Sequence, residues 1–341
     1  MLKAEIKKIT EMNNLTADEC SRAVDEIMSG AVSSVQIAAF LTALRTKGET
    51  AEEILGAARA MRRKVSRIRH PYDTVFDNCG TGGDGASTFN ISTTAAFVIA
   101  GCGVKVAKHG NRSVSSKCGS ADVLTALGVN INVTPKLMSV CLEQVGLGFL
   151  FAPALHPAMK AVAPVRSELG VRTIFNLLGP LTNPAFATHQ IIGVFAEEYV
   201  EKVAYAAGKL GIERAAVVYN REGIDELIPF GDNIVCLVSS DKIATSKFEA
   251  SDCGLSSCEL KELAGGTAEE NAMITRKVLE GEPGARRDTT LLNAGYGLYV
   301  AECAYSVREG ISIAADALDS GKALNILDHL IKMTGGNQYA A

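Results

Sequence analysis

The sequence predicts an α/β protein in which a small, all-helical N-terminal domain precedes a larger domain. That larger domain is expected to have a central, mostly parallel sheet flanked by helices. Two patterns support this: the first sixty or so residues carry helical signals only, and from about residue 73 short β-prone segments alternate with alanine-rich helical ones. With 341 residues, 47% of them hydrophobic, the chain can bury two unequal cores.

The N-terminal region reads as a succession of short helices. Three hydroxyl residues are each followed three positions later by Glu or Gln, the capping-box pattern that opens a helix. These pairs are Thr16 with Glu19, Ser33 with Gln36, and Thr50 with Glu53. Gly30 and Gly48 lie where two of these helices should end. Apolar residues recur at helical spacing between these glycines, so we expect a helical bundle suited to association with a second copy.

The remainder alternates between strand and helix signals. Strands are predicted over residues 74–79, 104–108, 129–133, 190–195, 215–219 and 234–238. Helices are predicted over residues 93–101 and 120–127, and after Glu197, Glu269, Arg287 and Ser306. The proline-rich segment 157–187 interrupts this alternation, either as a hinge or by packing back on the helical domain. We therefore expect a helical domain at 1–70, joined by segment 157–187, and an α/β domain made of 71–156 and 188–341.

Composition excludes several classes of protein. The formal net charge of −4 argues against a nucleic-acid partner bound by bulk electrostatics. No apolar run approaches the roughly 18 residues of a membrane span, and the first residues lack the apolar stretch of a signal peptide. Nine cysteines at irregular spacing suggest reduced thiols rather than disulfides or a zinc site, which favours a cytoplasmic location.

The first candidate binding motif is DNCGTGGDGASTFNIST, at residues 77–93. Its glycines can expose successive backbone amides to phosphate oxygens, and polar residues at 90–93 open an apolar helix. The alternative is a simple strand-to-helix turn. Asp84 would repel phosphate unless a metal-bound water or a ribose hydroxyl lies between them.

Polar residues follow a second predicted strand in KHGNRSVSSKCGSAD, at residues 108–122. Lys108, His109, Arg112 and Lys117 lie among small residues, at the end of a strand where α/β sheets bind ligands. The alternative is a solvated basic loop, and for His109 alone a purely structural role.

Two further features carry charge. Arg166 and Arg172 lie in an apolar setting, where a guanidinium usually has a planar anion as partner, either a substrate carboxylate or a structural acid such as Glu168. Asp225 and Glu226 form an adjacent acid pair on a loop, which suits Mg²⁺ but is also common in solvated loops.

Taken in order, these segments resemble the anthranilate phosphoribosyltransferases. The resemblance covers nearly the whole chain, through GTGGD, NIST, KHGNR with GSAD, RTIFNLLGPLTNPA and the DE pair. It implies the fold of nucleoside phosphorylases and related phosphoribosyltransferases, with a helical domain that forms a homodimer. It also implies phosphoribosyl pyrophosphate and anthranilate as substrates, with Mg²⁺, in a cleft between the domains.

The resemblance also assigns residues to these ligands. The phosphoribosyl pyrophosphate positions are Gly80, Gly83, Asp84, Thr88, Asn90, Ile91, Ser92, Thr93, Lys108, His109, Gly110, Asn111, Arg112, Ser113, Val114, Ser115, Ser116 and Ser120. The magnesium positions are Ser92, Asp225 and Glu226. The anthranilate positions are Gly80, Asn111 and Arg166, with His109, His156 and Pro180 lining the approach. Arg166, Asn111 and His109 are expected to serve catalysis. The residues after Glu226, LIPFGD, depart from the family's Ser-Pro continuation.

Three alternatives remain open at the level of sequence. A nucleoside phosphorylase would use free phosphate and need no acid pair for a metal. A relative that binds nucleic acid should have a basic surface and lack Asn111 and Arg166. A transferase for a different aromatic amine would keep the chemistry and change the acceptor.

Overall fold

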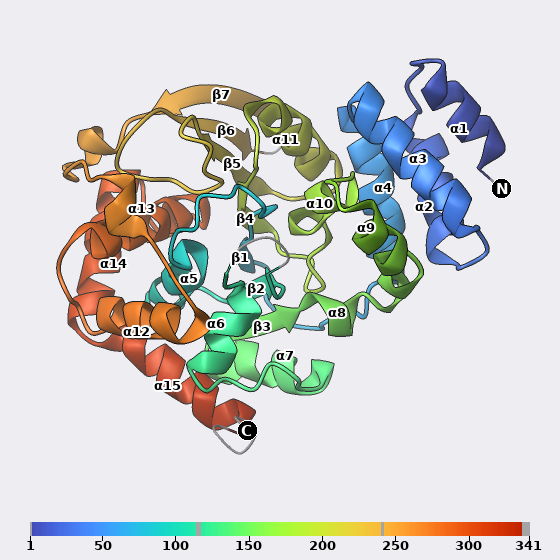
Figure 1. The fold of residues 1–341 in the computed structure, drawn as a ribbon. Coiled ribbons are helices and arrows are strands. Elements are labelled where there is room, and N and C mark those ends of the chain that lie inside the picture. Colours follow the sequence, from blue (N-terminus) through green and yellow to red (C-terminus); the bar gives the residue numbers. More distant parts are fainter. Residues whose placement is uncertain (1, 114–116, 240–241, 336–341) are drawn as a thin grey trace.

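The computed structural model describes residues 2–113, 117–239 and 242–335, and shows a helical layer set against an α/β body (Figure 1). The body is built on a sheet of seven strands in the order β3-β2-β1-β4-β5-β6-β7. The strands are β1 (Phe76–Asn78), β2 (Val106–Gly110), β3 (Leu147–Phe151), β4 (His189–Gly193), β5 (Arg214–Asn220), β6 (Asn233–Ser239) and β7 (Lys242–Phe248). The first five are parallel, and β6 and β7 are antiparallel, so the predicted mostly parallel sheet is confirmed.

Helices surround this sheet and form the N-terminal layer. The layer contains α1 (Lys3–Thr10), α2 (Ala17–Met28), α3 (Ser34–Lys47) and α4 (Ala51–Lys64). The α-helices of the body are α5 (Ile91–Gly101), α6 (Ser120–Ala126), α7 (Pro135–Gln144), α8 (Ala152–Leu155), α9 (Ala163–Leu169), α10 (Phe175–Leu178), α11 (Val200–Lys209), α12 (Ala268–Leu279), α13 (Ala285–Val300), α14 (Val307–Asp319) and α15 (Lys322–Thr334). The short 3₁₀ helices are η1 (Pro157–Ala161), η2 (Pro180–Thr182), η3 (Glu197–Tyr199), η4 (Ala250–Cys253) and η5 (Leu260–Leu263). None of the helices in the described ranges is long and apolar enough to cross a membrane.

The helical layer begins and ends its helices largely as the sequence predicts. Thr16 and Thr50 each form a complete capping box with the Glu three residues later. Ser33 forms half of one, because its side chain accepts the backbone N–H of Gln36 without a reciprocal bond. Gly48 ends α3 with a φ of 88°, a conformation that glycine adopts without strain.

Apart from the exposed edge strand β7, the sheet is largely buried on both faces, and the side chains of its strands alternate between two cores. In β4, Ile191 belongs to the core beneath α5, α13 and α15, whereas Ile192 belongs to the core shared with the helical layer. Val218 and Val217 of β5 divide in the same way. This alternation of side chains across a pleated sheet explains the nearly continuous apolar runs in its strands.

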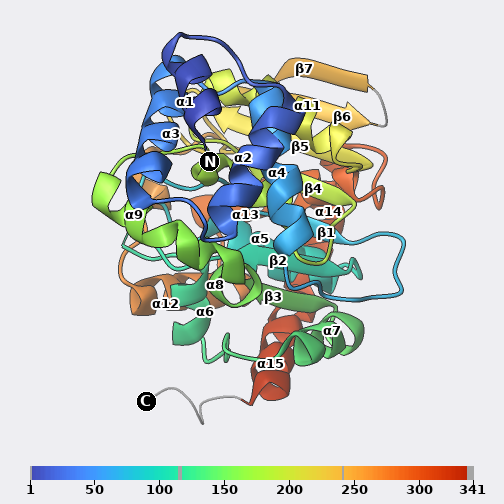
Figure 2. The ribbon, with the colours of Figure 1, turned by 90° about the vertical axis from the view of Figure 1, so that its right-hand side faces the viewer.

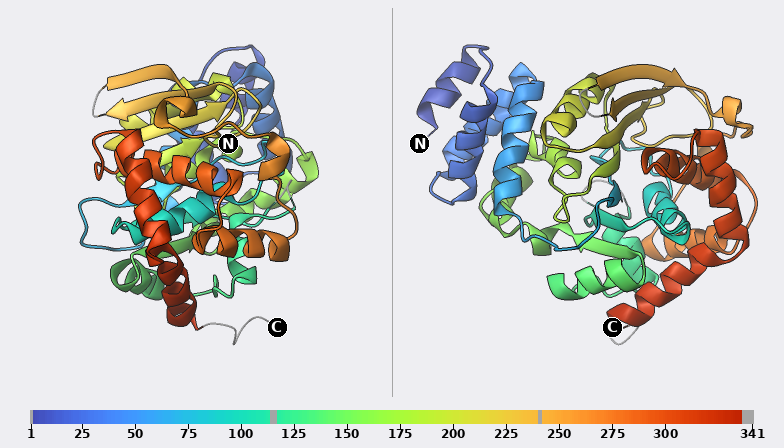
Figure 3. Two further views of the ribbon diagram at one scale, coloured as in Figure 1. Left: turned by 90° about the vertical axis from the view of Figure 1, so that its left-hand side faces the viewer. Right: turned by 180° about the vertical axis from the view of Figure 1, so that it is seen from behind.

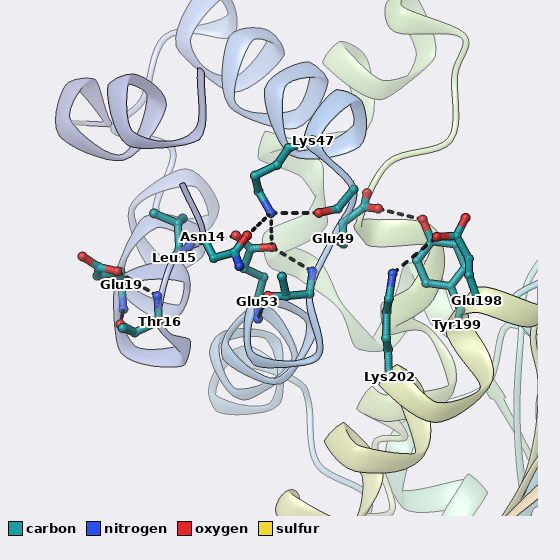
Figure 4. A network of polar contacts seen from close by, with 12 residues as sticks. Asn14, Leu15, Thr16, Glu19, Lys47, Glu49, Glu53, Glu198, Tyr199 and Lys202 are labelled. Carbon is teal, nitrogen blue, oxygen red and sulfur yellow. Dashed lines mark hydrogen bonds and ion pairs between the residues drawn. The ribbon is translucent and has the colours of Figure 1, made fainter. Parts of the chain in front are cut away.

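The helical layer lies on one side of the sheet, and α13, α14 and α15 lie on the opposite side (Figures 2 and 3). A polar network runs from the layer to the body (Figure 4). Lys47 of α3 pairs with Glu53 of α4 at 2.9 Å, and the hydroxyl of Tyr199 donates to Glu49 at 2.8 Å. Glu49 and Glu53 are both buried, so the network satisfies charges that would otherwise be costly at this boundary.

The proline-rich segment packs against the helical layer. Its helix α9 contacts α3, α10 contacts α4, and Val162 and Val165 join the apolar core of the layer. Packing of this kind is one of the two roles expected for segment 157–187. The domain boundaries at residues 70, 157 and 187 stay a prediction.

One predicted strand does not form, and two of the observed strands were not predicted. Residues 129–133 form no strand, although Val129 and Ile131 are buried alternately as in a strand. The side chain of Asn130 accepts the backbone N–H of Asn132, and this local turn diverts the backbone from a ladder. β3 was not predicted because its apolar run, LGFLF, lacks alternation, and β7 because it is an exposed polar edge strand.

Candidate active site

The glycine loop at residues 80–83 follows β1 and lies against the end of β4. Because β1 and β4 are parallel neighbours, both strands deliver their C-terminal residues to one edge of the sheet. The backbone N–H of Thr81 donates to the carbonyl of Gly193 at 2.8 Å, and the hydroxyl of Thr81 accepts the N–H of Phe195 at 3.1 Å. Gly82 and Gly83 have φ values of 65° and 77°, so the loop depends on residues without a Cβ.

Asp225 follows the C-terminal end of β5 and contacts this loop. Its Oδ2 accepts the backbone N–H of Gly82 at 2.9 Å. A Cβ at Gly80 would lie 2.6 Å from the same oxygen, which is closer than real Cβ contacts come. Gly193 is more strictly constrained, since a Cβ there would lie even closer to the backbone carbonyl oxygen of Asp225. The two glycines are therefore required by the approach of one acidic residue.

Three carboxylates gather at this point. Asp225 is buried, and burial together with the neighbouring Asp84 and Glu226 raises its pKa well above the ordinary value. Desolvation also raises the pKa of Glu226 to about 7, against the opposing influence of Lys108 and Ser92. The two acidic side chains predicted on the loop thus form one electrostatic cluster with Asp84, and the cluster lacks enough positive charge to stabilise its ionised form.

Lys108 is the cation that opposes this shift. It is buried in the middle of β2, and its Nζ donates to the carbonyl of Asn78 at 2.7 Å and to the side-chain oxygen of Asn78 at 3.3 Å. Asn78 in turn donates from Nδ2 to the carbonyl of Ser92 at 2.7 Å. The side chain of Asn78 therefore connects β2 to the N-terminus of α5.

The N-terminus of α5 faces the same edge. The backbone N–H of Ser92 donates to Glu226 at 3.3 Å, so one of the unpaired amides at this helix end already binds a carboxylate. Asn90 precedes the helix, and Asn271 of α12 donates to its side-chain oxygen at 3.0 Å. The amide nitrogen of Asn90 donates to the carbonyl of Cys118 at 3.4 Å, which ties the helix start to the loop after β2.

That second loop is organised by Asp122. Its carboxylate pairs with Arg112 at 2.8 Å and accepts the backbone N–H groups of Ser113 and Gly119 at 3.0 and 2.9 Å. These bonds lower the pKa of Asp122 against the effect of its burial. The carbonyl of Asn111 accepts from Ser120. Val114, Ser115 and Ser116 lie outside the described residues.

A neutral histidine pair lies behind the loop. Nδ1 of His109 is 3.0 Å from the carbonyl of Gly179, and Nε2 of His109 is 3.2 Å from Nε2 of His156. A carbonyl only accepts, so Nδ1 of His109 carries the proton and its Nε2 accepts from His156. Burial lowers the pKa of His109 to about 3 and that of His156 to about 4. Both rings are therefore neutral near pH 7.

The two arginines of the proline-rich segment have different surroundings. Arg166 donates to Asn176 at 3.2 Å and lies over the ring of Phe175, and desolvation lowers the pKa of its guanidinium. Arg172 lies over the ring of Phe195 and donates to the carbonyl of Gly83. Neither takes part in an ion pair among the described residues, so the Glu168 partner considered from sequence is not observed.

The structure thus brings Gly80, Asp84, Ser92, Lys108, Asp225 and Glu226 together. Asn90 lies directly before α5 and contacts the second loop at Cys118, and Arg112 is paired with Asp122 in that loop. Thr88 is placed differently, in an isolated bridge to Ala264. Arg166 is connected only indirectly, since its segment also carries the Gly179 carbonyl that holds His109. Within the described ranges, no three His, Cys, Asp or Glu side chains are arranged to hold a metal ion by themselves.

Sequence reasoning missed several residues that hold this site. Asp77 is buried in β1 and accepts the backbone N–H of His109 at 3.0 Å and the amide of Asn183 at 2.7 Å. Burial raises its pKa to about 6. Asn78 and Asn293 are further examples. The available signal was the presence of polar residues inside otherwise apolar strands and helices, where each must find a partner.

Comparisons with known proteins agree with one another along the chain. Residues 3–65 match the model of the glycosyl transferase family, helical bundle domain, and residues 72–324 match the glycosyl transferase family, a/b domain. The anthranilate phosphoribosyltransferase of Geotalea uraniireducens is 50% identical over 98% of this chain and 99% of its own. The corresponding protein of Symbiobacterium thermophilum is 49% identical over 98% of each chain.

Solved structures give the same result. The crystal structure of anthranilate phosphoribosyltransferase from Thermus thermophilus superposes with a TM-score of 0.91 at 43% identity, covering 96% of this chain and 98% of that one. The Saccharomyces cerevisiae enzyme in complex with PRPP and Mg gives 0.88 at 30% identity, with coverages of 97% and 98%. The yeast enzyme in complex with 4-fluoroanthranilate gives the same TM-score and identity, with coverages of 98% and 97%.

Proposed function

The chain belongs to the anthranilate phosphoribosyltransferase family, and we propose that the edge of the sheet where β1, β2 and β4 end is its active site. It transfers the phosphoribosyl group of phosphoribosyl pyrophosphate to the amine of anthranilate, a step of tryptophan biosynthesis. One observation supports this location of the active site most strongly. Three carboxylates converge on a glycine loop and a helix N-terminus without enough positive charge to balance them, and desolvation raises the pKa of two of them.

The donor is proposed to lie across the glycine loop and the N-terminus of α5. The set is the one expected from sequence: Gly80, Gly83, Asp84, Thr88, Asn90, Ile91, Ser92, Thr93, Lys108, His109, Gly110, Asn111, Arg112, Ser113, Val114, Ser115, Ser116 and Ser120. Open amides at the start of an 11-residue helix and the glycines with positive φ support phosphate binding there. Lys108 uses two hydrogen bonds on Asn78, and an ammonium has a third to offer to a phosphate oxygen.

The carboxylates fit Mg²⁺ as the partner of the donor. Mg²⁺ binds through one or two carboxylates and completes its shell with substrate phosphates and water, which agrees with a site that has no full protein cage in the described ranges. Asp225 and Glu226, with Ser92 beside them, are the proposed ligands. When bound, Mg²⁺ would neutralise charge on the pyrophosphate leaving group. The yeast relative in complex with PRPP and Mg supports this proposal.

The acceptor is proposed to be held by Arg166, with Asn111 and Gly80 beside it and His109, His156 and Pro180 along its approach. A desolvated guanidinium without an acidic partner among the described residues is suited to a planar carboxylate, which it can bind with two parallel hydrogen bonds. The neutral side chains of His109 and His156 form an uncharged side of the proposed acceptor site. The yeast relative in complex with 4-fluoroanthranilate supports an acceptor of this kind.

In the reaction, the bond from ribose C1 to the pyrophosphate oxygen breaks and a bond from the anthranilate nitrogen to C1 forms. The nitrogen then loses one proton. His109 is a poor general base, because its pKa is about 3 and its Nε2 lone pair accepts a hydrogen bond from His156. An aniline-type nitrogen bonded to a fourth group is strongly acidic, so water suffices as the acceptor. The residues of this chain therefore act by orientation and by stabilising the leaving group.

We extend the proposal to assembly and location. Met12 and Val35 are exposed apolar residues of the helical layer, with 63% and 79% of their surface accessible, and they suit a homodimer formed through this layer. Buried thiols such as Cys20 and Cys141 suit a reducing compartment, the cytoplasm. No nucleic-acid or membrane partner is proposed.

A fluorescence assay tests this function and its metal. The purified chain should consume anthranilate only when phosphoribosyl pyrophosphate and Mg²⁺ are both present, and other aminobenzoates should react more slowly. The double variant Asp225→Asn, Glu226→Gln should keep the fold and lose this turnover, because the proposed metal ligands lose their charge. Turnover with free phosphate and a nucleoside, or a wild-type response of the double variant to Mg²⁺, would refute the proposal.

A further inference from the structure

The loop that carries the acid pair is held by buried asparagine side chains. We define the acid loop as residues 224–230, between β5 and β6. Three asparagines surround it: Asn220 at the end of β5, Asn233 at the start of β6, and Asn293 in the middle of α13. All three are buried, with 0%, 1% and 3% of their surface accessible. Buried amides at this density require partners, and the acid loop supplies most of them.

Asn293 clamps the residue that directly follows the acid pair. Its Oδ1 accepts the backbone N–H of Leu227 at 3.3 Å, and its Nδ2 donates to the carbonyl of Leu227 at 2.7 Å. The same nitrogen donates to the carbonyl of Thr289 one turn earlier in α13, at 2.9 Å. The side chain of Asn293 therefore binds both backbone groups of Leu227, as a neighbouring strand would, and links Leu227 to helix α13.

Asn233 clamps the next residue in the same way. Its Oδ1 accepts the N–H of Ile228 at 3.1 Å, and its Nδ2 donates to the carbonyl of Ile228 at 2.9 Å. Asn220 completes the arrangement by donating to the carbonyl of Phe230 at 2.9 Å and to Oδ1 of Asn233 at 3.0 Å. Two consecutive residues after Glu226 thus have both backbone groups bound by amide side chains.

This arrangement has a specific electrostatic advantage. Asp225 and Glu226 are adjacent, with Asp84 nearby, so their mutual repulsion favours moving the loop outward into water. A cationic clamp would neutralise the carboxylates and compete with an incoming cation. An acidic clamp would add to the repulsion. An asparagine does neither, and it binds both an N–H and a carbonyl at one residue.

From this geometry we infer that Asn293 and Asn233 are positioning residues for the acid pair, which hold Asp225 and Glu226 in place to receive a divalent cation bound to pyrophosphate. The inference rests on the proposed role of the acid pair. Asn293 is the better residue to test, because its clamp lies next to Glu226 and it comes from a helix rather than from the loop's own strands. Residues that orient metal ligands typically change metal affinity by about 10- to 100-fold when replaced.

The experiment measures Mn²⁺ binding in the presence of pyrophosphate, by electron paramagnetic resonance of the free ion, alongside steady-state kinetics with Mg²⁺. Asn293→Ala removes the clamp, and Asn293→Leu keeps the approximate size of the side chain while removing its donors and its acceptor without adding charge. Thr290→Val is the matched control: Thr290 is buried on the same helix, and its hydroxyl donates within α13, to the carbonyl of Arg286. Thermal unfolding identifies the variants that remain folded.

We expect either folded Asn293 variant to bind Mn²⁺ about tenfold more weakly or worse. The KM for Mg²⁺ should rise in parallel, the KM for anthranilate should stay unchanged, and excess Mg²⁺ should restore part of the turnover. Thr290→Val should match the wild type. Wild-type Mn²⁺ affinity in a folded Asn293 variant would overturn the inference. Wild-type affinity in Asp225→Asn, Glu226→Gln would instead overturn the metal assignment, so the two failures are distinguishable.

Discussion

Replacement of Arg166 by glutamine tests how the chain recognises its acceptor. The variant Arg166→Gln removes the positive charge and most donors, and keeps a polar side chain that can still contact Asn176. Because Arg166 has no ion pair among the described residues and is partly desolvated, its charge is available for the substrate carboxylate. The variant should therefore weaken the binding of anthranilate and leave that of the sugar donor nearly unchanged.

The magnitude follows from the kind of bond that is lost. Hydrogen bonds to a charged group contribute about 1.5–3 kcal/mol, and the paired geometry of a guanidinium and a carboxylate favours the upper value. Since about 1.4 kcal/mol is a factor of ten, kcat/KM for anthranilate should fall by about 10- to 150-fold. The fall in kcat/KM should reflect both weaker binding and poorer orientation of anthranilate, because the bond between Arg166 and the carboxylate also directs the amine to ribose C1.

A second acceptor turns this loss into a test of the carboxylate. 2-Aminobenzamide keeps the amine and replaces the carboxylate by a neutral amide. The wild type should prefer anthranilate strongly over this analogue, and Arg166→Gln should lose most of that preference. Arg172→Gln is the control, because Arg172 contacts the carbonyl of Gly83 in the donor loop and should affect the donor instead. An undiminished preference in Arg166→Gln, or equal effects on both substrates, would refute the assignment.

Two further predictions concern the glycine loop and the histidine pair. Gly80→Ala places a Cβ 2.6 Å from Oδ2 of Asp225, and displacement of that carboxylate should lower kcat by about 100-fold. Gly208→Ala is the control, because a Cβ at Gly208 in α11 would meet its nearest neighbour, Val238, at 3.4 Å and should leave kcat unchanged. Equal rates in the two variants would contradict the role of the close approach. The pKa values of about 3 for His109 and about 4 for His156 keep both rings neutral from about pH 8 to about pH 5, so their NMR signals, assigned with His156→Gln, should not titrate there. A midpoint near pH 6.5 for either ring would show that it is solvated.

The fold could be predicted wherever local signals and packing agree. Capping pairs located the starts of α2, α3 and α4, and the apolar segments at 190–195 and 215–219 located β4 and β5. The strand predicted at residues 129–133 does not form, because alternating burial occurs in any extended segment that crosses a core. The hydrogen bond from Asn132 to the side chain of Asn130 turns the backbone there, and a hydrophobicity pattern does not reveal such a bond. β7 was not predicted from the sequence, because an edge strand with one neighbour needs little apolar surface.

Residue types in the sequence point to the glycine loop and the acid pair, and the structure brings the two into contact through the hydrogen bond from Gly82 to Asp225. The sequence does not point to residues that act from inside the structure. Asp77 and Asn293 contact backbone groups that are distant in the sequence, at His109 and Leu227, so no local spacing reveals them. The same is true of the contact between Arg172 and Gly83. These pairings depend on the sheet order, which sequence periodicity alone does not determine.

The buried polar residues explain why the acid pair can exist at all. An ionised carboxylate removed from water is costly, and desolvation acts on both Asp225 and Glu226. The cost remains in the ligand-free protein because neutral asparagines, rather than lysines or arginines, hold the acid loop, and Lys108 is directed mainly to Asn78. Under the proposed metal assignment, a cation arriving with its pyrophosphate would relieve this cost, and part of the affinity for the metal-bound donor would come from destabilisation of the empty site. Glu226→Gln should therefore raise the Tm of the ligand-free protein at pH 8 while weakening the binding of Mn²⁺ with pyrophosphate, and a lower Tm in this variant would contradict the argument.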